Sequence, residues 1–282
     1  MRRVGTLAVP YVAGILLLVA VPSLGAVALA FTDFSGVSAP VFTGLDNFRR
    51  LLGDEGFWRA LGNSGVYVVI AVPLRLAIAV SLALLLNRRG PGVGAARAAA
   101  YLPTVVPDVA YAFVWLWLLN PFYGPLALVA DAAGYSPGWL TDPWGARISI
   151  AVMGAFQIGE AFLVALAARH TIPSVIYEAA AVDGLRPLQV VRRITLPIMA
   201  PVLALLALRD VVFSFQANFV PALVLTDGGP RYATTFLPLY IYRQAFRYFR
   251  LGYASAMTIS MFVLTALVIY VQYRLARRWR LI

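Results

Sequence analysis

Six long apolar stretches limit what this chain can fold into. They cover about residues 7–31, 61–86, 98–119, 146–168, 202–225 and 253–276. Each is near or above the roughly 20 residues that a helix needs to cross the hydrocarbon of a membrane. We therefore predict an all-α membrane protein with six transmembrane helices, in which residues 1–282 form a single transmembrane domain.

Composition supports this fold class and excludes several kinds of site. Hydrophobic residues make up 61% of the chain and charged residues only 12%, which is typical of a membrane protein with several spans. Cysteine is absent and His170 is the one histidine, so a disulfide framework or a Cys/His metal site cannot be built. The carboxylates in or beside the spans have no acid/base or metal-ligand spacing. We predict no metal site, no catalytic residue and no enzyme activity of the chain itself.

The distribution of arginine predicts the topology. Six spans put both termini and the polar connection after residue 168 on one side of the membrane. That side carries thirteen arginines and the opposite loops carry seven, so the positive-inside rule makes it cytoplasmic. The net charge of +11 suggests nucleic acid as a partner, but the arginines are dispersed at span ends. Membrane topology therefore explains the charge better, and we expect no nucleic-acid partner.

Residues 171–197 form a polar island between two spans. A first short helix runs through Glu178 and ends at Gly184, which supplies the backbone freedom for a corner. A second begins at Pro187, follows a helical apolar spacing and stops before Pro197. The pattern predicts a surface helical hairpin. The alternative is an amphipathic connector that merely lies on the bilayer surface.

The spacing within this hairpin resembles the EAA loop of the membrane subunits of binding-protein-dependent ABC importers. The resemblance implies six helices of the type I ABC importer permease fold and a cytoplasmic coupling hairpin that binds the ATPase subunit. In that family Glu178 would meet a cationic group of the ATPase, and Gly184 would make the corner. The coupling residues implied by the resemblance are Glu178, Ala179, Ala180, Asp183, Gly184, Ile194, Leu196 and Pro197.

A second pattern lies in the predicted outer loops. The run Leu225-Thr226-Asp227-Gly228-Gly229-Pro230, followed by Thr234, Thr235, Tyr240-Ile241-Tyr242 and Phe246, resembles the MalF-like permeases of carbohydrate importers. Gly44-Leu45-Asp46-Asn47-Phe48 also fits them.

This resemblance implies a set of partners and a location. The partners would be a MalG-like permease subunit forming a heterodimer, two copies of a cytoplasmic ABC ATPase, a periplasmic or lipid-anchored sugar-binding protein, the sugar and membrane lipid. The chain would need no cofactor of its own, because ATP and Mg²⁺ would be bound by the partner ATPase. Its location would be the cytoplasmic (inner) membrane of a bacterium or archaeon, as a multi-pass protein with both termini cytoplasmic.

Five charged residues fall within the spans, where an unpaired charge at a helix centre costs on the order of 2.5–3.5 kcal/mol. At 1.5 Å per residue, Arg75 and Asp108 reach a similar depth, and Glu160 and Arg209 match in the same way. We predict the ion pairs Arg75–Asp108 and Glu160–Arg209. For the first pair we favour a structural clamp between helices over a substrate site.

The family places substrate contacts on the spans matching the fourth and fifth here. Polar groups beside aromatic rings suit a hydroxyl-rich ring, although packing between helices explains each residue about as well. The substrate-binding candidates are Gln157, Glu160, Asp210, Phe213, Ser214, Gln216 and Asn218, with Phe156 and Phe215 as further stacking faces.

The sequence therefore predicts the transmembrane subunit of an ATP-driven uptake transporter for a mono- or oligosaccharide, forming half of the translocation channel. One alternative is a proton-coupled secondary transporter that uses Asp108 or Glu160 as a relay. This alternative leaves the hairpin unexplained, and transporter folds of that kind usually show internal repeats with more spans. A membrane enzyme is a third alternative, without a nucleophile–base pair to support it. Within the importer hypothesis, glycerol phosphate or a polyol remains open as cargo.

Overall fold

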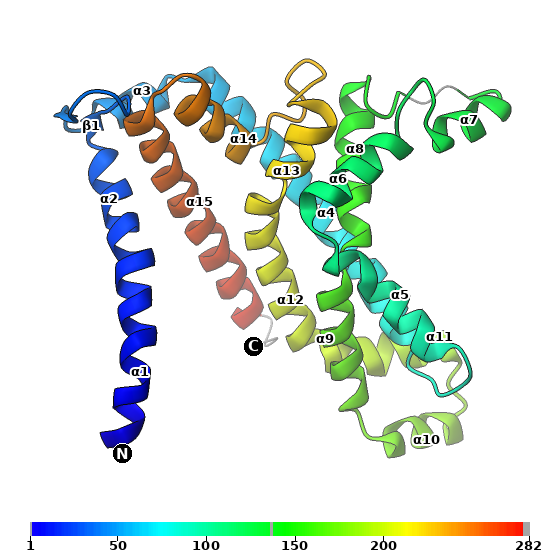
Figure 1. The fold of residues 1–282 in the computed structure, drawn as a ribbon. Coiled ribbons are helices and arrows are strands. Elements are labelled where there is room, and N and C mark those ends of the chain that lie inside the picture. Colours follow the sequence, from blue (N-terminus) through cyan, green and yellow to red (C-terminus); the bar gives the residue numbers. More distant parts are fainter. Residues whose placement is uncertain (1, 136–137, 279–282) are drawn as a thin grey trace. The chain divides into compact units, whose positions relative to one another are not determined.

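The computed structural model describes residues 2–135 and 138–278. These residues form two compact units, Met1–Arg59 with Leu237–Ala266, and Ala60–Phe236 with Leu267–Ile282. The division falls inside two long helices, α4 (Glu55–Leu85) and α15 (Leu251–Arg278). Figure 1 labels the elements along the chain, and each unit is described by itself.

The first unit begins with a helical run near the N-terminus and continues into a small strand pair. The run consists of α1 (Arg2–Ile15), the π-helical turn η1 (Leu16–Ala20) and α2 (Val21–Leu29). Strands β1 (Thr32–Asp33) and β2 (Val41–Phe42) pair antiparallel, with Thr32 opposite Phe42. Helix α3 (Asp46–Leu52), the start of α4, α14 (Leu237–Tyr242), η4 (Arg243–Arg247) and residues 251–266 of α15 complete the unit.

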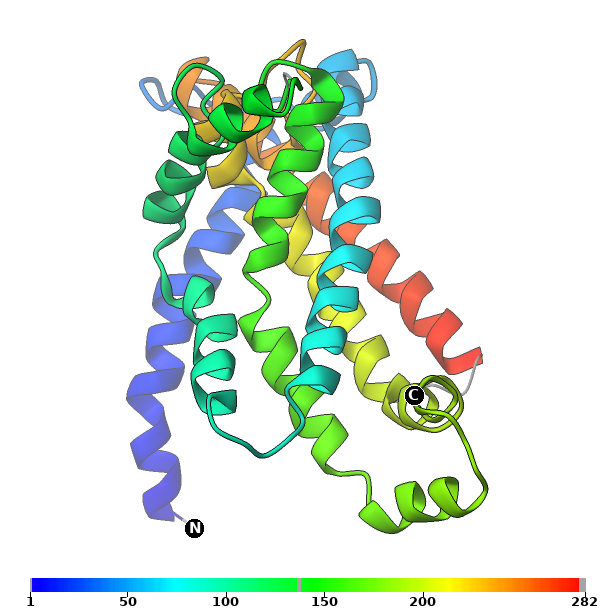
Figure 2. The same cartoon turned by 90° about the vertical axis from the view of Figure 1, so that its right-hand side faces the viewer.

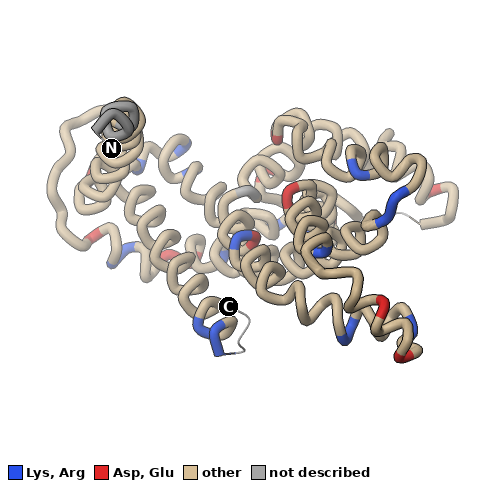
Figure 3. Tube along the Cα trace, turned by 90° about the horizontal axis from the view of Figure 1, so that it is seen from below, with Lys and Arg blue, Asp and Glu red and all other residues tan. Residues whose placement is uncertain are grey.

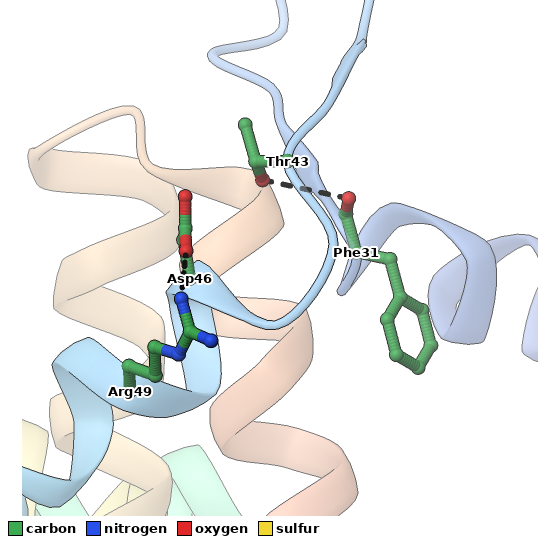
Figure 4. Close-up of polar contacts among 4 residues, drawn as sticks. All are labelled: Phe31, Thr43, Asp46 and Arg49. Carbon is green, nitrogen blue, oxygen red and sulfur yellow. Dashed lines mark hydrogen bonds and ion pairs between the residues drawn. The ribbon is translucent and has the colours of Figure 1, made fainter.

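Side chains of the Gly44-Leu45-Asp46-Asn47-Phe48 stretch hold the end of α2 in place. The Nδ2 atom of Asn47 donates to the carbonyls of Ala30 at 2.9 Å and Thr32 at 2.8 Å, and Phe48 packs on Phe31 with ring centroids 5.4 Å apart. Thr43 donates through its backbone N–H (2.9 Å) and its hydroxyl (3.4 Å) to the carbonyl of Phe31, beside the exposed Asp46–Arg49 ion pair (Figure 4). The stretch therefore leads into the short helix α3 and ties it to the end of α2.

Asp54 joins three elements of the first unit. Its carboxylate accepts hydrogen bonds from the backbone N–H of Gly56 at 2.8 Å and of Phe57 at 3.2 Å, which caps α4. It also accepts from the hydroxyls of Tyr240 at 2.9 Å and Tyr253 at 2.6 Å. Burial alone would raise the pKa of the Asp54 carboxyl, but these hydrogen bonds, led by those from the two tyrosines, hold it below its ordinary value.

The second unit is a bundle of helices around α4 and α12. It contains residues 60–85 of α4, α5 (Val93–Val105), α6 (Asp108–Leu118), α7 (Pro125–Ala132), α8 (Pro143–Phe156) and α9 (Gly159–His170). It continues with α10 (Ser174–Val182), α11 (Pro187–Val190), η2 (Val191–Thr195), α12 (Leu196–Ala217), α13 (Phe219–Pro221) and η3 (Ala222–Thr226). Helices α5 and α9 run side by side, and α10 lies beyond the end of α9 (Figures 1 and 2).

Small residues let the helices of the second unit pack closely. Ala79 and Ala83 of α4 are fully buried against Phe162 and Ala165 of α9, with Met199 of α12 in the same apolar cluster. Small side chains allow helix backbones to approach, which is how helices associate where lipid removes the hydrophobic driving force.

Within the described residues, four helical runs are long and apolar enough to cross a membrane unbroken, Val9–Leu29, Glu55–Leu85, Pro187–Thr226 and Leu251–Arg278. The predicted third and fourth spans are each a bent pair instead, α5 with α6 and α8 with α9. Arginine and acidic residues occupy only short stretches of the trace in Figure 3. Arg280, counted in the topology prediction, lies outside the described residues.

Candidate functional site

A cavity of about 180 Å³ lies where the two bent spans of the second unit break. The axis turns by 102° between α5 and α6 and by 51° between α8 and α9. Both breaks contribute to the wall of the cavity, together with α4 and α12. The lining residues are Arg75, Thr104, Asp108, Gln157, Ile158, Glu160, Ala161, Arg209, Asp210 and Phe213.

Local sequence explains both breaks. Val106 adopts an extended conformation (φ −70°, ψ 131°), as expected for a residue that precedes a proline, and α6 starts after Pro107. At the second break, the N–H of Gly159 donates to the hydroxyl of Thr104 at 2.9 Å. A Cβ at Gly159 would collide with that hydroxyl, so only glycine lets the start of α9 meet α5 there. Pro107 and Gly159 thus explain the two breaks, and polar residues of both spans meet where the spans bend.

The prediction that Arg75 pairs with Asp108 is wrong. The Nε atom of Arg75 lies 3.1 Å from Oδ2 of Asp210 on α12, and the Arg75 side chain is buried while that of Asp210 is 14% exposed. Arg75 also donates to the hydroxyl of Ser214, which itself donates to the carbonyl of Asp210 at 2.6 Å. Equal depth would pair Arg75 with Asp108 only if the third span were straight. The span bends at Pro107, and the side of α4 that carries Arg75 faces α12.

The predicted pair Glu160–Arg209 is confirmed. Its side chains are 54% and 52% exposed, so water and salt screen the pair and its contribution to stability is small. The guanidinium group of Arg209 also lies 5.8 Å from the ring centre of Phe213. This pair therefore shapes the open wall of the cavity, whereas Arg75 and Asp210 form its buried wall.

Asp108 lines the cavity without an arginine beside it. Its closest polar contact is the Nε2 atom of Gln157, 3.4 Å from Oδ1. Among the ion pairs of the described residues, none includes Asp108. Its carboxylate can accept further hydrogen bonds, and carboxylates are strong acceptors of hydroxyl hydrogens.

The predicted substrate-binding residues fall into two groups. Gln157, Glu160, Asp210 and Phe213 line the cavity. Ser214 is buried behind it against Arg75, Gln216 is exposed, and Asn218 is fully buried with no hydrogen bond to either side-chain amide atom among the described residues. Of the further aromatic candidates, Phe156 packs on Trp115 and Phe215 is buried against Val68, Val72 and Val211.

Thr104 and Arg147 are polar residues that sequence reasoning missed. A threonine between two prolines in an apolar span is a signal that could have identified Thr104. Arg147 on α8 donates to the carbonyl of Ala233 at 3.0 Å and to Oδ1 of Asn63 at 2.7 Å, and its position at the predicted start of a span concealed this role.

The loop that carries Gly228-Gly229-Pro230 is held by a dense set of hydrogen bonds. We call residues 226–235 the Gly-Gly-Pro loop. The hydroxyl of Thr234 donates to the carbonyl of Gly229 at 2.6 Å and lies 2.6 Å from the hydroxyl of Thr226. Asn63 of α4 donates to the carbonyls of Tyr232 at 2.8 Å and Thr235 at 3.2 Å. Polar side chains of the loop, together with Asn63, thus fix the loop backbone.

The predicted coupling residues lie on and after α10. The helix ends in a Schellman motif, in which the N–H of Gly184 bonds the carbonyl of Ala181 at 3.1 Å and the N–H of Leu185 bonds that of Ala180 at 3.0 Å. Gly184 has φ +68°, as its predicted role as a corner requires. Glu178, Ala179, Asp183 and Gly184 are exposed, and Ala180 is buried.

One side of α10 contacts the rest of the second unit, and the other side is exposed to solvent. The hydroxyl of Tyr177 lies 3.2 Å from that of Thr195, and the Arg169 guanidinium stacks on the Tyr177 ring at 4.0 Å. Val175 and Val182 are 68% and 88% exposed. An apolar, solvent-facing helix surface beside an exposed carboxylate is suited to contact another protein.

The second helix of the predicted hairpin is not separate. Residues Pro187–Thr226 form one continuous helical run, and Pro197 lies in the first turn of α12 rather than ending a helix. The π-helical turn η2 at Val191–Thr195 precedes it. A wider turn accommodates a proline that cannot donate a backbone hydrogen bond, so the predicted stop at Pro197 is wrong. Ile194 and Leu196 are half-buried on this run.

Similarity to known proteins covers most of the chain. Residues 75–281 match the family model described as "Binding-protein-dependent transport system inner membrane component". The chain is 32% identical over 276 residues to the "Probable ABC transporter permease protein YesP" of Bacillus subtilis, which covers 96% of this chain and 89% of the relative. It is 31% identical over 261 residues to the "Trehalose/maltose transport system permease protein MalF" of Thermococcus litoralis, covering 90% and 87%.

A solved structure shares the fold. A chain of the crystal structure of a bacterial alginate ABC transporter in complex with an alginate pentasaccharide-bound periplasmic protein superposes with a TM-score of 0.84 and 24% identity, covering 98% of this chain and 94% of that chain. The type I importer permease fold predicted from the sequence is therefore confirmed. By family model, sequence identity and fold, this chain belongs to the inner-membrane permease components of binding-protein-dependent ABC transport systems.

Proposed function

We propose that the chain is the transmembrane subunit of an ATP-driven carbohydrate importer, and that the cavity at the two helix breaks is its part of the cargo site. The cavity carries the proposal, because it gathers carboxylates, an amide and an aromatic ring at the breaks of two apolar spans. Broken helices that place polar groups at membrane depth are typical of transporter binding sites.

The charges of the cavity favour a neutral, hydroxyl-rich cargo. Arg75 is paired with Asp210, and Arg209 is paired with Glu160. The carboxylate of Asp108 has only the amide of Gln157 close to it. Hydroxyl groups of a sugar can donate to Asp108 while the C–H face of its ring packs on the half-exposed ring of Phe213, whereas a phosphate would need a free guanidinium group. The name of the MalF relative is consistent with a sugar of this kind.

The size of the cavity supports a channel built from two permease subunits. At about 180 Å³ it is smaller than the roughly 300–1,000 Å³ of typical ligand pockets. One subunit would therefore supply one wall of the site, and a MalG-like subunit would supply the other.

The coupling segment, residues 174–184, would bind a cytoplasmic ATPase of which the transporter holds two copies. ATP and Mg²⁺ would be bound by the ATPase, and a periplasmic or lipid-anchored binding protein would deliver the sugar. This proposal rests on the exposed Glu178, Ala179 and Gly184, the bare apolar side of α10 and the buried Ala180 that ties the helix to the unit. It places both termini on the cytoplasmic side.

The test is co-purification of the chain with the products of its neighbouring genes. We expect wild type to recover an ATPase whose ATP hydrolysis is stimulated by the sugar-loaded binding protein. A Glu178→Arg, Gly184→Trp variant should lose the ATPase or its stimulation. Asp33→Arg, at an exposed carboxylate of β1, is the control and should keep both. A wild-type chain that transports with a proton gradient and no ATPase would overturn the proposal.

A second arm tests the cargo cavity. Asp108→Ala should retain the ATPase and its basal hydrolysis but lose sugar transport. Screening the binding protein against neutral sugars, polyols and glycerol phosphate would name the cargo. Selective binding of glycerol phosphate would contradict the neutral cargo inferred from the paired arginines.

A further inference from the structure

The connection between α4 and α5 forms a hollow that the proposed function does not use. It measures about 480 Å³ and is framed by the short connection itself, the first turns of α5 and the last residue of α9. We call it the basic hollow. Its lining residues are Asn87, Arg88, Arg89, Gly90, Val93, Gly94, Arg97 and His170.

Arg97 gives the basic hollow a fixed frame. Its Nε and Nη2 atoms donate to the carbonyl of Leu86 at 3.2 and 2.8 Å, and Nη2 also lies 3.4 Å from the carbonyl of Arg88. These bonds satisfy carbonyls left free at the end of α4 and close the connection on itself. Gly92, with φ +79°, makes the turn into α5. The Arg97 side chain and the turn at Gly92 therefore fix the backbone of the hollow.

The charge of the basic hollow is entirely positive. Three of its eight lining residues are arginine, a histidine comes from a second element, and none is Asp or Glu. Arg88 and Arg89 are exposed, and no ion pair among the described residues includes either of them. The positive-inside rule explains arginines at a span end, but it does not explain why they surround a hollow with His170 on its far side.

The chemistry of the lining residues specifies the ligand. Arginine forks match the oxygens of a phosphate group, and a site with two free guanidinium groups favours an anion that bears several acceptors. The connection joins two membrane-crossing segments within a few residues, so it lies at the boundary between hydrocarbon and water. Basic pockets at that boundary bind anionic lipid headgroups.

We propose that the basic hollow binds a phosphate group, and that the source is the phosphodiester headgroup of an anionic lipid. The lipid would brace the α4–α5 connection against the end of α9. Because α9 leads directly into α10, the headgroup would lie beside the coupling segment. The inference requires only that the chain is embedded in a membrane, so it stands or fails separately from the cargo proposed above.

The test uses the complete transporter, purified in detergent with its partner chains. Phosphatidylglycerol, phosphatidylcholine and inorganic phosphate are titrated in separate arms, and binding is followed by native mass spectrometry and by the melting temperature. We expect phosphatidylglycerol to be retained and to raise the melting temperature, and phosphatidylcholine to do neither. Equal stabilisation by inorganic phosphate, lost in the variant described next, would keep the phosphate site but overturn the lipid source.

Two matched double variants test whether lipid binding depends on the arginines of the basic hollow. Arg88→Gln, Arg89→Gln should weaken phosphatidylglycerol binding about thirtyfold, from roughly fivefold for each arginine near an anionic lipid. Arg277→Gln, Arg278→Gln removes two arginines from the end of α15, which does not line the basic hollow, and should change binding little. Equal effects of the two variants, or no effect of either, would overturn the proposal.

A single variant keeps the test available if the double variant does not assemble. His170→Gln changes the side of the basic hollow contributed by α9 and leaves the connection intact. It should weaken phosphatidylglycerol binding while the partner chains still co-purify. Unchanged lipid binding in an assembled His170→Gln transporter would remove α9 from the site and contradict its two-sided construction.

Discussion

The Gly-Gly-Pro loop and the coupling segment both carry motif-like residues, but they use them in opposite ways. In the Gly-Gly-Pro loop, Thr234 and Thr235 are 0% and 5% exposed and donate to carbonyls of the same loop. In the coupling segment Glu178, Ala179 and Asp183 are exposed, and backbone hydrogen bonds form the corner at Gly184 while Tyr177 anchors the helix. The polar side chains of the Gly-Gly-Pro loop therefore stabilise the fold of the loop itself.

The two segments show that motif-like residues can serve either the fold of the chain or contact with a partner. A residue whose side chain is bonded inward is needed to build the structure, and its loss is measured as lost stability. A residue left in solvent on an anchored helix is available to a partner chain, and its loss is measured as lost binding. The predictions below test this separation on the free energy of unfolding, beginning with the largest expected change.

Asn63→Ala should be the most destabilising of these changes. It removes the donor to two loop carbonyls and the acceptor of the Arg147 Nη2 atom, while the Nε atom of Arg147 keeps its bond to the Ala233 carbonyl. Each buried polar group left unsatisfied costs about 1–3 kcal/mol. We expect a loss of about 3–5 kcal/mol, measured by denaturant or thermal unfolding of the purified protein. Asn87→Ala, at the more open end of α4, is the control. Similar stability of the two variants would show that the loop is not held from α4.

Thr234→Val should cost about 1–3 kcal/mol, because it keeps the shape of the side chain but leaves the Gly229 carbonyl without its donor and the Thr226 hydroxyl with only its bond to the Ala222 carbonyl. Thr171→Val is the matched control. The hydroxyl of Thr171 also donates to a carbonyl, that of Ala168 at 2.8 Å, but it is exposed and water can replace it. Equal melting temperatures for the two variants would contradict the structural role of the loop threonines.

The features predicted correctly from the sequence are those that depend only on position along a helix axis. Hydropathy along the chain located the spans, the spacing after Glu178 located α10 and its corner at Gly184, and depth alone paired Glu160 with Arg209. In each case the answer depends on position along a helix axis. The start and end of helices, glycine corners and depth in the membrane are all of this kind.

The errors concern rotation and bending, which position along the axis does not determine. Arg75 was matched to the right depth, but the face of α4 on which it lies directs it to Asp210. The third span was treated as straight, yet it bends by 102° at Pro107. Pro197 was expected to end a helix, but a π-helical turn absorbs it. The cavity arises from such bends, so it could not be located from the sequence.

Gly184→Ala should lower stability by about 1–2 kcal/mol, the ordinary cost of a left-handed conformation for a residue with a Cβ. No atom lies within 4 Å of the added Cβ, so the cost is conformational and not steric. Gly62→Ala, also without a neighbour within 4 Å but inside α4, is the matched control and should be neutral or slightly stabilising. The same loss at both positions would indicate that the corner is not the cause.

Glu178→Gln should leave stability within about 0.5 kcal/mol of wild type, as exposed substitutions generally do. Its carboxylate has no partner among the contacts of the described residues, so the folded chain alone loses nothing. Binding of the ATPase should nevertheless weaken about ten- to hundredfold, the value of one hydrogen bond to a charged group. Asp33→Asn, at an exposed carboxylate outside the coupling segment, should change neither quantity. A Glu178→Gln chain that unfolds as easily as Thr234→Val would place both loops in the same structural class and remove the distinction on which the coupling role rests.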